Sequence, residues 1–433
     1  PHPRARATSG RPAASRPTES GARERRSCGE VTIGAMSAPQ QLLIAGGGIG
    51  AMAAACAVAR AGWQVRMYER APQFAEVGAG LQLGPNVTRV LHAWGLADAL
   101  RAVAAFPDRL TVRSAVTGAE LGALALGARS VARYGAPYAT VHRADLHALL
   151  HRACLSAGEV NIHCDQAVLR YEDLGTAVRI HTGATPVIEG DALLGADGLL
   201  SGVRQQLLRD GPPQPVGDLA YRAMLRMQSL PAGWRGNQVT AWLGPRLHLV
   251  QYPVRGGRAL NVVAIVRGAA RPGDVDDSSA AAAELERAFH GACSPLRDLI
   301  AAVPQASLNA QPWRRWVLAA RPPVHGATHM ARGAVALLGD AAHPMRPYLA
   351  QGAGMAIEDA AELAQALAMD AVDVPTRLQR YALARWQRVA RVQARSMRNG
   401  QIFHAEGVVR MGRDASIRLL GERVLDVPWL YGR

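Results

Sequence analysis

Glycines and one acid near the start of the chain have the spacing that binds a dinucleotide. Gly46 and Gly48 follow a buried run at 42–45, and Ala51 takes the third place of a GxGxx(G/A) pattern. Gly46 permits a tight turn, Gly48 lets the backbone approach a pyrophosphate, and the following helix offers its positive N-terminal end to the phosphates. Glu69 comes 18 residues after Ala51, where its carboxylate can accept hydrogen bonds from both ribose hydroxyls.

A second group of residues could hold the other end of such a cofactor. Gly339 and Asp340 end an apolar run, so the Asp340 carboxylate can meet a ribityl hydroxyl. Gly352, Ala353 and Gly354 open a helix whose N-terminus can stabilise negative charge on a reduced flavin ring. A simple NAD dehydrogenase needs neither of these features, and the segment therefore favours FAD.

The elements that must position these groups predict an α/β fold. Residues 42–69 read as strand, helix and strand, and 334–344 returns to the pattern of a buried parallel strand. Residues 219–268 contain four strand-like runs, which indicate an inserted, mostly antiparallel sheet. We expect one helix near 283–302 and a largely helical segment over 353–420.

Composition excludes several classes of protein. The net charge is +15, but every basic residue is Arg and these are scattered, which indicates composition bias rather than a nucleic-acid site. Five cysteines without CxxC spacing predict reduced thiols in a cytoplasmic protein. Residues 42–59 are uncharged, but their glycines favour a βαβ unit over a membrane span. His147 and His151 lack a third ligand, so we predict a solvated helix face and no metal.

The N-terminal segment differs from the rest. Residues 1–35 are rich in Arg, Ser, Pro and Gly and have almost no large apolar side chains, so we expect disorder. The segment lacks the apolar core of a signal peptide. Our hypothesis is that Met36 is the natural start and that 1–35 is a non-native extension, which mass spectrometry of the native N-terminus would test.

Three motifs in the right order give the chain a family resemblance over roughly 40–400. They are the glycine-rich start with Glu69, HRADL with the later DG segment (142–146 and 197–198), and the GD segment with AAHP…P…QGAG. The chain resembles the single-component FAD-dependent aromatic hydroxylases, the salicylate and hydroxybenzoate monooxygenases. Within that family, the segments 76–86, 248–257 and 337–354 most resemble 3-hydroxybenzoate 6-hydroxylases.

The resemblance implies a Rossmann-like FAD-binding domain with a parallel sheet, built from separated segments, and an antiparallel sheet domain over the substrate. The boundaries we predict are 40–110, 138–215 and 325–375 for the FAD-binding domain, 111–137 and 216–324 for the substrate domain, and 376–433 for a helical C-terminal region.

The resemblance also implies the chemistry. NADH or NADPH would reduce FAD, O₂ would give a flavin C4a-hydroperoxide, and a ring carbon of a phenolic acid would be hydroxylated. His248 and Tyr252 are the predicted catalytic residues, because they lie four apart on one face of a strand and can deprotonate or hold a phenol. The predicted FAD-binding residues are Gly46, Gly48, Gly50, Glu69, Arg70, Arg143, Asp340, Gly352, Ala353 and Gly354.

Several alternatives remain open at this point. The activity could be that of a salicylate 1-hydroxylase, or of a related flavin monooxygenase with a natural-product substrate. An NAD-binding dehydrogenase, or an interaction protein that keeps a nucleotide as structural support, belongs to a different class. We expect a small aromatic substrate, no nucleic acid, and a monomer or homodimer.

Overall fold

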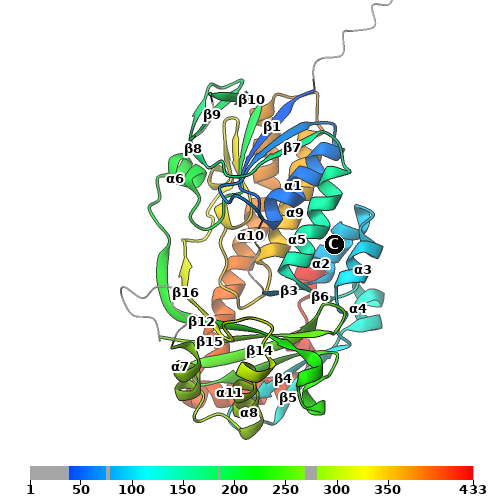
Figure 1. Cartoon of the computed structure of the whole chain (residues 1–433), viewed down its shortest axis with the longest axis vertical. Coiled ribbons are helices and arrows are strands. Elements are labelled where there is room, and N and C mark those ends of the chain that lie inside the picture. Colours follow the sequence, from blue (N-terminus) through cyan, green and yellow to red (C-terminus); the bar gives the residue numbers. More distant parts are fainter. Residues whose placement is uncertain (1–38, 75–78, 184–185, 269–279, 433) are drawn as a thin grey trace, which may run out of the picture. The chain divides into compact units, whose positions relative to one another are not determined.

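The computed structural model describes residues 39–74, 79–183, 186–268 and 280–432 (Figure 1). Residues 1–35 and Met36 lie outside the described residues. From Pro39 onward the chain forms one compact unit, so the domain boundaries given above remain a prediction. No helix in the described ranges combines the length and apolar character needed to cross a membrane.

The glycine-rich segment forms the predicted βαβ unit. It consists of β1 (Gln41–Ala45), α1 (Ile49–Arg60) and β2 (Gln64–Tyr68), and both strands are parallel members of one sheet. The strand order of that sheet is β17-β18-β11-β1-β2-β7, parallel except for β17 with β18. The further strands are β7 (Val160–His163), β11 (Ala192–Gly195), β17 (Ala331–Arg332) and β18 (Val335–Leu337).

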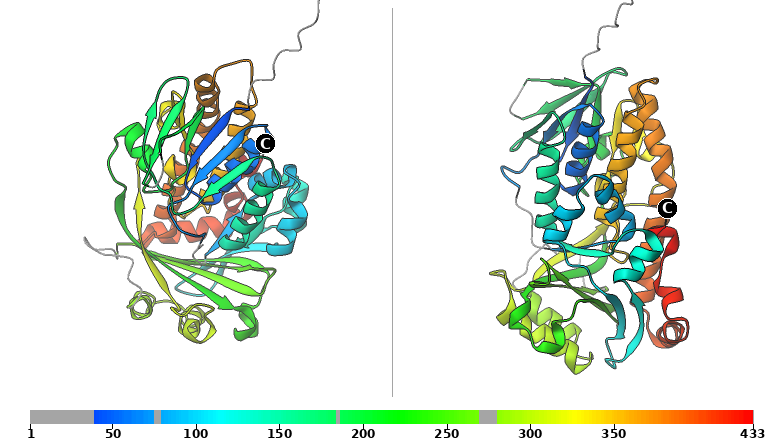
Figure 2. Two further views of the ribbon diagram at one scale, coloured as in Figure 1. Left: turned by 45° about the horizontal axis from the view of Figure 1, so that its top comes forward. Right: turned by 90° about the vertical axis from the view of Figure 1, so that its right-hand side faces the viewer.

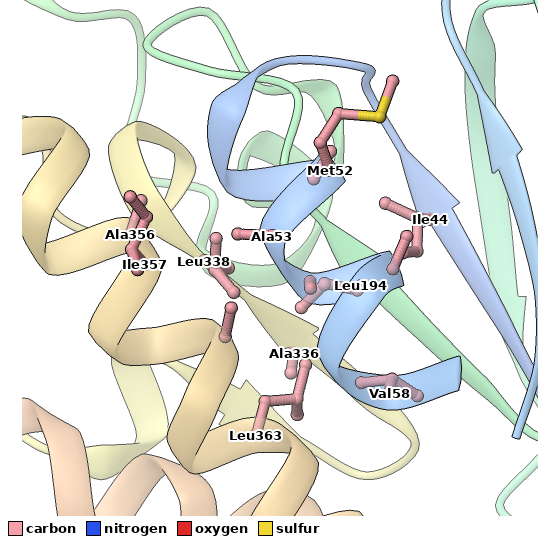
Figure 3. Packing of buried hydrophobic residues seen from close by; sticks show 14 of the residues in the cluster. Ile44, Met52, Ala53, Val58, Leu194, Ala336, Leu338, Ala356, Ile357 and Leu363 are labelled. Carbon is pink, nitrogen blue, oxygen red and sulfur yellow. The ribbon is translucent and has the colours of Figure 1, made fainter. Parts of the chain in front are cut away.

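Small residues let two helices pack closely on this sheet. A Cβ added at Gly50 of α1 would lie 2.7 Å from Leu338 Cδ2 and 3.2 Å from the Cβ of Ala356 in α9 (Gly352–Leu367). Figure 3 shows Ala53 of α1 facing this region, with Leu338 and Ala356 beside it. The lack of a side chain at Gly50 and the small side chain of Ala356 allow the two helices to approach closely.

A second sheet of seven strands carries the other half of the fold (Figure 2). Its order is β16-β12-β15-β14-β13-β4-β5, and only the β13–β4 pair is parallel. The mixed α/β fold and the four predicted strand runs are therefore confirmed. The strands are β4 (Arg109–Ser114), β5 (Glu120–Ala125), β12 (Gln214–Arg226), β13 (Gln238–Gly244), β14 (Leu247–Val254), β15 (Ala259–Val266) and β16 (Arg314–Ala320).

One face of the seven-stranded sheet is covered by two helices rather than by the single helix predicted at 283–302. They are α7 (Ala281–Ala288) and α8 (Ser294–Ala306), and they share a buried cluster with Leu249 of β14. The prediction was wrong because Gly291 interrupts the apolar pattern and a new helix begins at Ser294, with Pro295 in its first turn, where proline is tolerated.

The remaining elements are helices and two small sheets. The segment 353–420 is largely helical as predicted, through α9, α10 (Val374–Phe403) and α11 (Gly407–Leu420). The other helices are α2 (Pro85–Ala93), α3 (Ala97–Val103), α4 (Gly127–Tyr134), α5 (Arg143–Leu155), α6 (Gly202–Leu208), α12 (Glu422–Leu425) and α13 (Pro428–Tyr431). Small sheets pair β3 (Gly80–Leu83) with β6 (Ala139–His142), and β8 (Val168–Asp173) with β9 (Val178–Thr182) and β10 (Ile188–Gly190).

Candidate active site

A cavity of about 300 Å³ lies between the glycine-rich segment and the seven-stranded sheet. Its wall contains residues from α1, β3, α5, α9 and the loop before α9, and on the opposite side residues from β12, β14 and β15. Eight of the predicted site residues line it together: Gly48, Gly50, Arg143, His248, Tyr252, Asp340, Gly352 and Ala353.

Two helices begin at this cavity without a side-chain cap. Gly48 is the N-cap of α1 and Gln351 the N-cap of α9, and both residues line the cavity. The first N–H groups of each helix therefore lack intrahelical partners, and the helix dipoles add positive potential at the same place. Such a pair of helix ends fits a ligand that carries anionic groups at two separate points.

The glycine turn itself is shaped by close backbone contact. Gly46 has φ +102°, and a Cβ there would lie 2.5 Å from the carbonyl oxygen of Ala196. A Cβ at Gly48 would meet no atom within 4 Å, because this residue faces open cavity space. Gly46 is therefore required by the fold, whereas Gly48 leaves room for a ligand.

Four predicted FAD-binding residues do not line the cavity. Gly46 supports the turn, and Gly354 packs in α9, where a Cβ would lie 2.8 Å from Val87 Cγ2. Arg70 is exposed. The Glu69 carboxylate lies beside the turn and accepts hydrogen bonds from the Gly47 N–H (2.6 Å) and the Ala71 N–H (2.8 Å).

Asp340 stands at the cavity wall. Its side chain is accessible through the cavity, yet protein atoms surround it closely. This burial raises the pKa of Asp340, and the positive groups at His343 and Arg143 oppose the rise.

A buried ionic network fixes the segment behind Asp340. Asp359 of α9 is fully buried and pairs with His343 Nε2 (2.5 Å) and Arg385 Nε of α10 (2.7 Å). The positive neighbours outweigh burial and lower the pKa of Asp359 to about 2. Arg204 of α6 donates to the carbonyl of Ala341 at 3.0 Å. The loop that carries Asp340 is thus held from two sides.

His248 and Tyr252 lie on the cavity face of β14, four residues apart, so the predicted strand geometry is confirmed. The pKa of His248 is lowered well below its usual value, mainly by burial and secondly by the neighbouring His404. Burial also raises the pKa of Tyr252. At neutral pH the imidazole is therefore uncharged and the phenol keeps its proton.

Two further groups lie around these side chains. His404, which follows the last residue of α10, places its Nε2 2.7 Å from Nδ1 of His248. Arg222 of β12 lines the cavity, its Cζ lies 4.9 Å from the centroid of the Trp316 ring, and its buried Nε has no hydrogen-bond partner among the described residues. His404 stands in no local motif, so sequence reasoning missed it and no sequence signal marks it.

A larger cavity of about 690 Å³ adjoins the first one. His248, Gln82 and Pro347 line both cavities, so His248 lies where they meet. The wall of the larger cavity is mostly apolar and comes from the sheet and the C-terminal helices. It includes Leu110, Val112, Val239, Leu243, Val250 and Ile417.

The prediction for His147 was wrong. The side chain is buried, and its Nε2 lies 2.7 Å from the carbonyl oxygen of Gly47, because α5 packs against the glycine turn. Over the described ranges, no group of three or more His, Cys, Asp and Glu side chains could hold a metal ion.

Comparison with known proteins gives consistent matches. A family model described as "FAD binding domain" matches residues 40–396. The 3-hydroxybenzoate 6-hydroxylase of Polaromonas naphthalenivorans is 37% identical over 393 residues, which cover 90% of this chain and 95% of that protein. A salicylate hydroxylase substrate complex matches with a TM-score of 0.74 and 25% identity, covering 91% and 95% of the chains. Klebsiella pneumoniae HpxO, complexed with FAD and uric acid, matches in fold with a TM-score of 0.78 and 24% identity. The match covers 90% of this chain and 96% of HpxO.

Proposed function

The chain belongs to the family of FAD-dependent aromatic monooxygenases, and from this membership we propose that it hydroxylates a phenolic aromatic acid, with 3-hydroxybenzoate as the first candidate. One observation carries the proposal. Two side chains suited to deprotonating and holding a phenol line the same cavity as the residues suited to FAD.

The residues present fit FAD. The uncapped ends of α1 and α9 both open on the cavity, and the buried Nε atoms of Arg222 and Arg346 there have no hydrogen-bond partner among the described residues. Gly48, Gly50 and Arg143 would hold the phosphate side, and Asp340, Gly352 and Ala353 the flavin side. Glu69, Arg70, Gly46 and Gly354 would support the site from outside the cavity wall. The chemistry that bound FAD supplies is oxidation of NADH or NADPH and activation of O₂ for transfer of one oxygen atom.

His248 is the proposed base. Its imidazole is neutral at neutral pH and can accept the phenol proton of the substrate on Nε2, since Nδ1 faces His404. The resulting phenolate is richer in electrons at the ring carbons ortho and para to its oxygen. Tyr252 keeps its proton and can donate a hydrogen bond to the phenolate oxygen. The mostly apolar wall of the larger cavity limits the access of water to His248.

The assay of choice is NADH and NADPH consumption with 3-hydroxybenzoate, salicylate, 4-hydroxybenzoate and 6-hydroxynicotinate, with chemical identification of the product. Stoichiometric formation of a dihydroxybenzoate from 3-hydroxybenzoate supports the proposal. Salicylate converted in preference would assign the salicylate 1-hydroxylase activity instead. A bound flavin without acceleration of NAD(P)H oxidation by any aromatic compound would contradict the proposal.

A second candidate substrate class is a larger phenolic natural product. The adjoining cavity of about 690 Å³ is in the range of pockets that take drug-sized ligands, roughly 300–1,000 Å³. Its wall beyond His248 is apolar, which suits a fused ring or an alkyl substituent. Comparison of kcat/KM for a hydroxybenzoate and for a larger alkyl-substituted analogue distinguishes the two classes.

We also propose a cytoplasmic monomer or homodimer with no nucleic-acid partner. Cys56, Cys154, Cys164 and Cys293 are free thiols, as expected in a reducing compartment. Light scattering after size-exclusion chromatography measures the oligomeric state.

A further inference from the structure

Two buried histidines from distant parts of the chain share a hydrogen bond next to the cavity. His248 lies in β14 and His404 ends α10, and the side chain of each is 2% exposed. Nδ1 of His248 and Nε2 of His404 are 2.7 Å apart. Two neutral imidazoles can form such a bond only when one nitrogen carries a proton and the other does not.

The position of His248 decides which of its nitrogens is available to a ligand. Nδ1 is occupied by His404, and within the described part of the chain Nε2 has no protein partner. His248 also lines both cavities. A base at this position therefore needs the tautomer that has its proton on Nδ1 and its lone pair on Nε2.

Three charged groups act on His404. Asp218 of β12 acts on it as an anion, while Arg267 after β15 and Arg413 of α11 act as cations. Tyr348 packs its ring perpendicular to His404 at 5.4 Å and donates a hydrogen bond to Asp218 at 2.6 Å. Burial is the main cause that lowers the pKa of His404, to about 4, so both imidazoles are neutral at rest.

We propose that His404 is a positioning residue for the hydroxylation, which holds His248 in the tautomer with a free Nε2 and takes up the Nδ1 proton of His248 when Nε2 accepts the phenol proton. In this step the phenol O–H bond breaks, an Nε2–H bond forms, and the proton on Nδ1 moves to Nε2 of His404. The positive charge then lies on His404, nearer the Asp218 carboxylate, and His248 returns to neutrality. The inference depends on the proposed function, because it assigns His248 as the base.

Two variants of the holoenzyme separate hydrogen bonding from packing. His404→Leu removes the hydrogen-bond partner of Nδ1. His404→Gln provides an amide oxygen that can accept a hydrogen bond from the Nδ1–H group but cannot take up its proton. We expect His404→Leu to lower kcat about 10- to 100-fold with KM and FAD content little changed, and His404→Gln to recover at least part of this loss. The pH profile of kcat should shift in both variants. His181→Gln, in β9 on a separate sheet, is the control for a histidine-to-glutamine exchange and should match the wild type.

A second readout does not depend on the substrate. In protein labelled with ¹⁵N-histidine, the His248 signals, assigned through His248→Asn, report which ring nitrogen carries the proton. We expect the Nδ1–H tautomer in the wild type and in His404→Gln, and a mixture or the Nε2–H tautomer in His404→Leu. An Nε2–H tautomer in the wild type, or an unchanged kcat and pH profile in His404→Leu, overturns the inference. If no phenolic acid is hydroxylated but the tautomer depends on His404, the proposed function fails and the positioning contact stands.

Discussion

Alanine substitutions at Gly46 and Gly48, two residues of one turn, should affect different properties. The first should lower folding stability and the second should lower FAD affinity. At Gly46 the added Cβ would lie 2.5 Å from the Ala196 oxygen, on a residue with φ +102°. The positive φ costs of order 1–3 kcal/mol for a residue other than glycine. Overpacking against a fixed backbone adds about 1–3 kcal/mol. The sum, roughly 2–6 kcal/mol, is a large part of the 5–15 kcal/mol that is typical of folded domains.

Gly48→Ala differs in both respects. The residue has φ −76°, which alanine adopts without strain, and its Cβ would meet no protein atom within 4 Å. The methyl group would instead occupy cavity space next to the start of α1. We therefore expect Gly48→Ala to keep the melting temperature of the flavin-free protein and to lose FAD affinity.

Thermal melts with and without excess FAD, together with the flavin absorbance of the purified protein, measure both effects. Gly46→Ala should melt several degrees lower in both conditions, while Gly48→Ala should lose only the stabilisation that FAD adds. Equal melting temperatures for Gly46→Ala and the wild type would refute the steric reasoning. Full flavin content in Gly48→Ala would refute the placement of FAD at this turn.

Three further outcomes follow from the site. His248→Asn should lower turnover about 10²- to 10⁴-fold with FAD content unchanged, and an unchanged turnover removes His248 from the mechanism. Asp359→Asn should destabilise the fold by about 3–5 kcal/mol in urea titrations, because Arg385 loses a buried partner; the exposed Asp98→Asn is its control. The lowered pKa of His404, about 4 against 6.5, means that unfolding takes up a proton between these values. The contribution of His404 to the free energy of unfolding is therefore complete above pH 6.5 and decreases by about 2 kcal/mol by pH 5. The His404→Gln variant should lack this decrease.

The sequence predicts the parts of the site that rest on local geometry. Gly46, Gly48 and Asp340 stand at turns where a strand ends, and such turns have recognisable residue patterns. The separation of His248 and Tyr252 matches the period of a strand, which is why their shared face could be predicted.

Contacts between distant elements could not be predicted in this way. His404 is one of 13 histidines, and nothing near it in sequence indicates that the end of α10 meets β14. His147 has the spacing of a solvated face, but the packing of α5 against the glycine turn buries it. In both cases the partner is chosen by the tertiary arrangement and not by the periodicity of the element itself.

The number of residues between Arg385 in α10 and His404, which follows α10, determines whether both side chains reach their partners. Arg385 pairs with the carboxylates of Glu358 and Asp359 in α9, and His404 meets His248 on the seven-stranded sheet, with about 28 Å of helix rise between Arg385 and His404. Deletion of one residue in this stretch would rotate His404 by about 100° relative to Arg385. Insertions and deletions should therefore be tolerated in the surface turns of this enzyme but not within α10. This helix fixes the distance and the relative rotation of the residues that contact the two sheets.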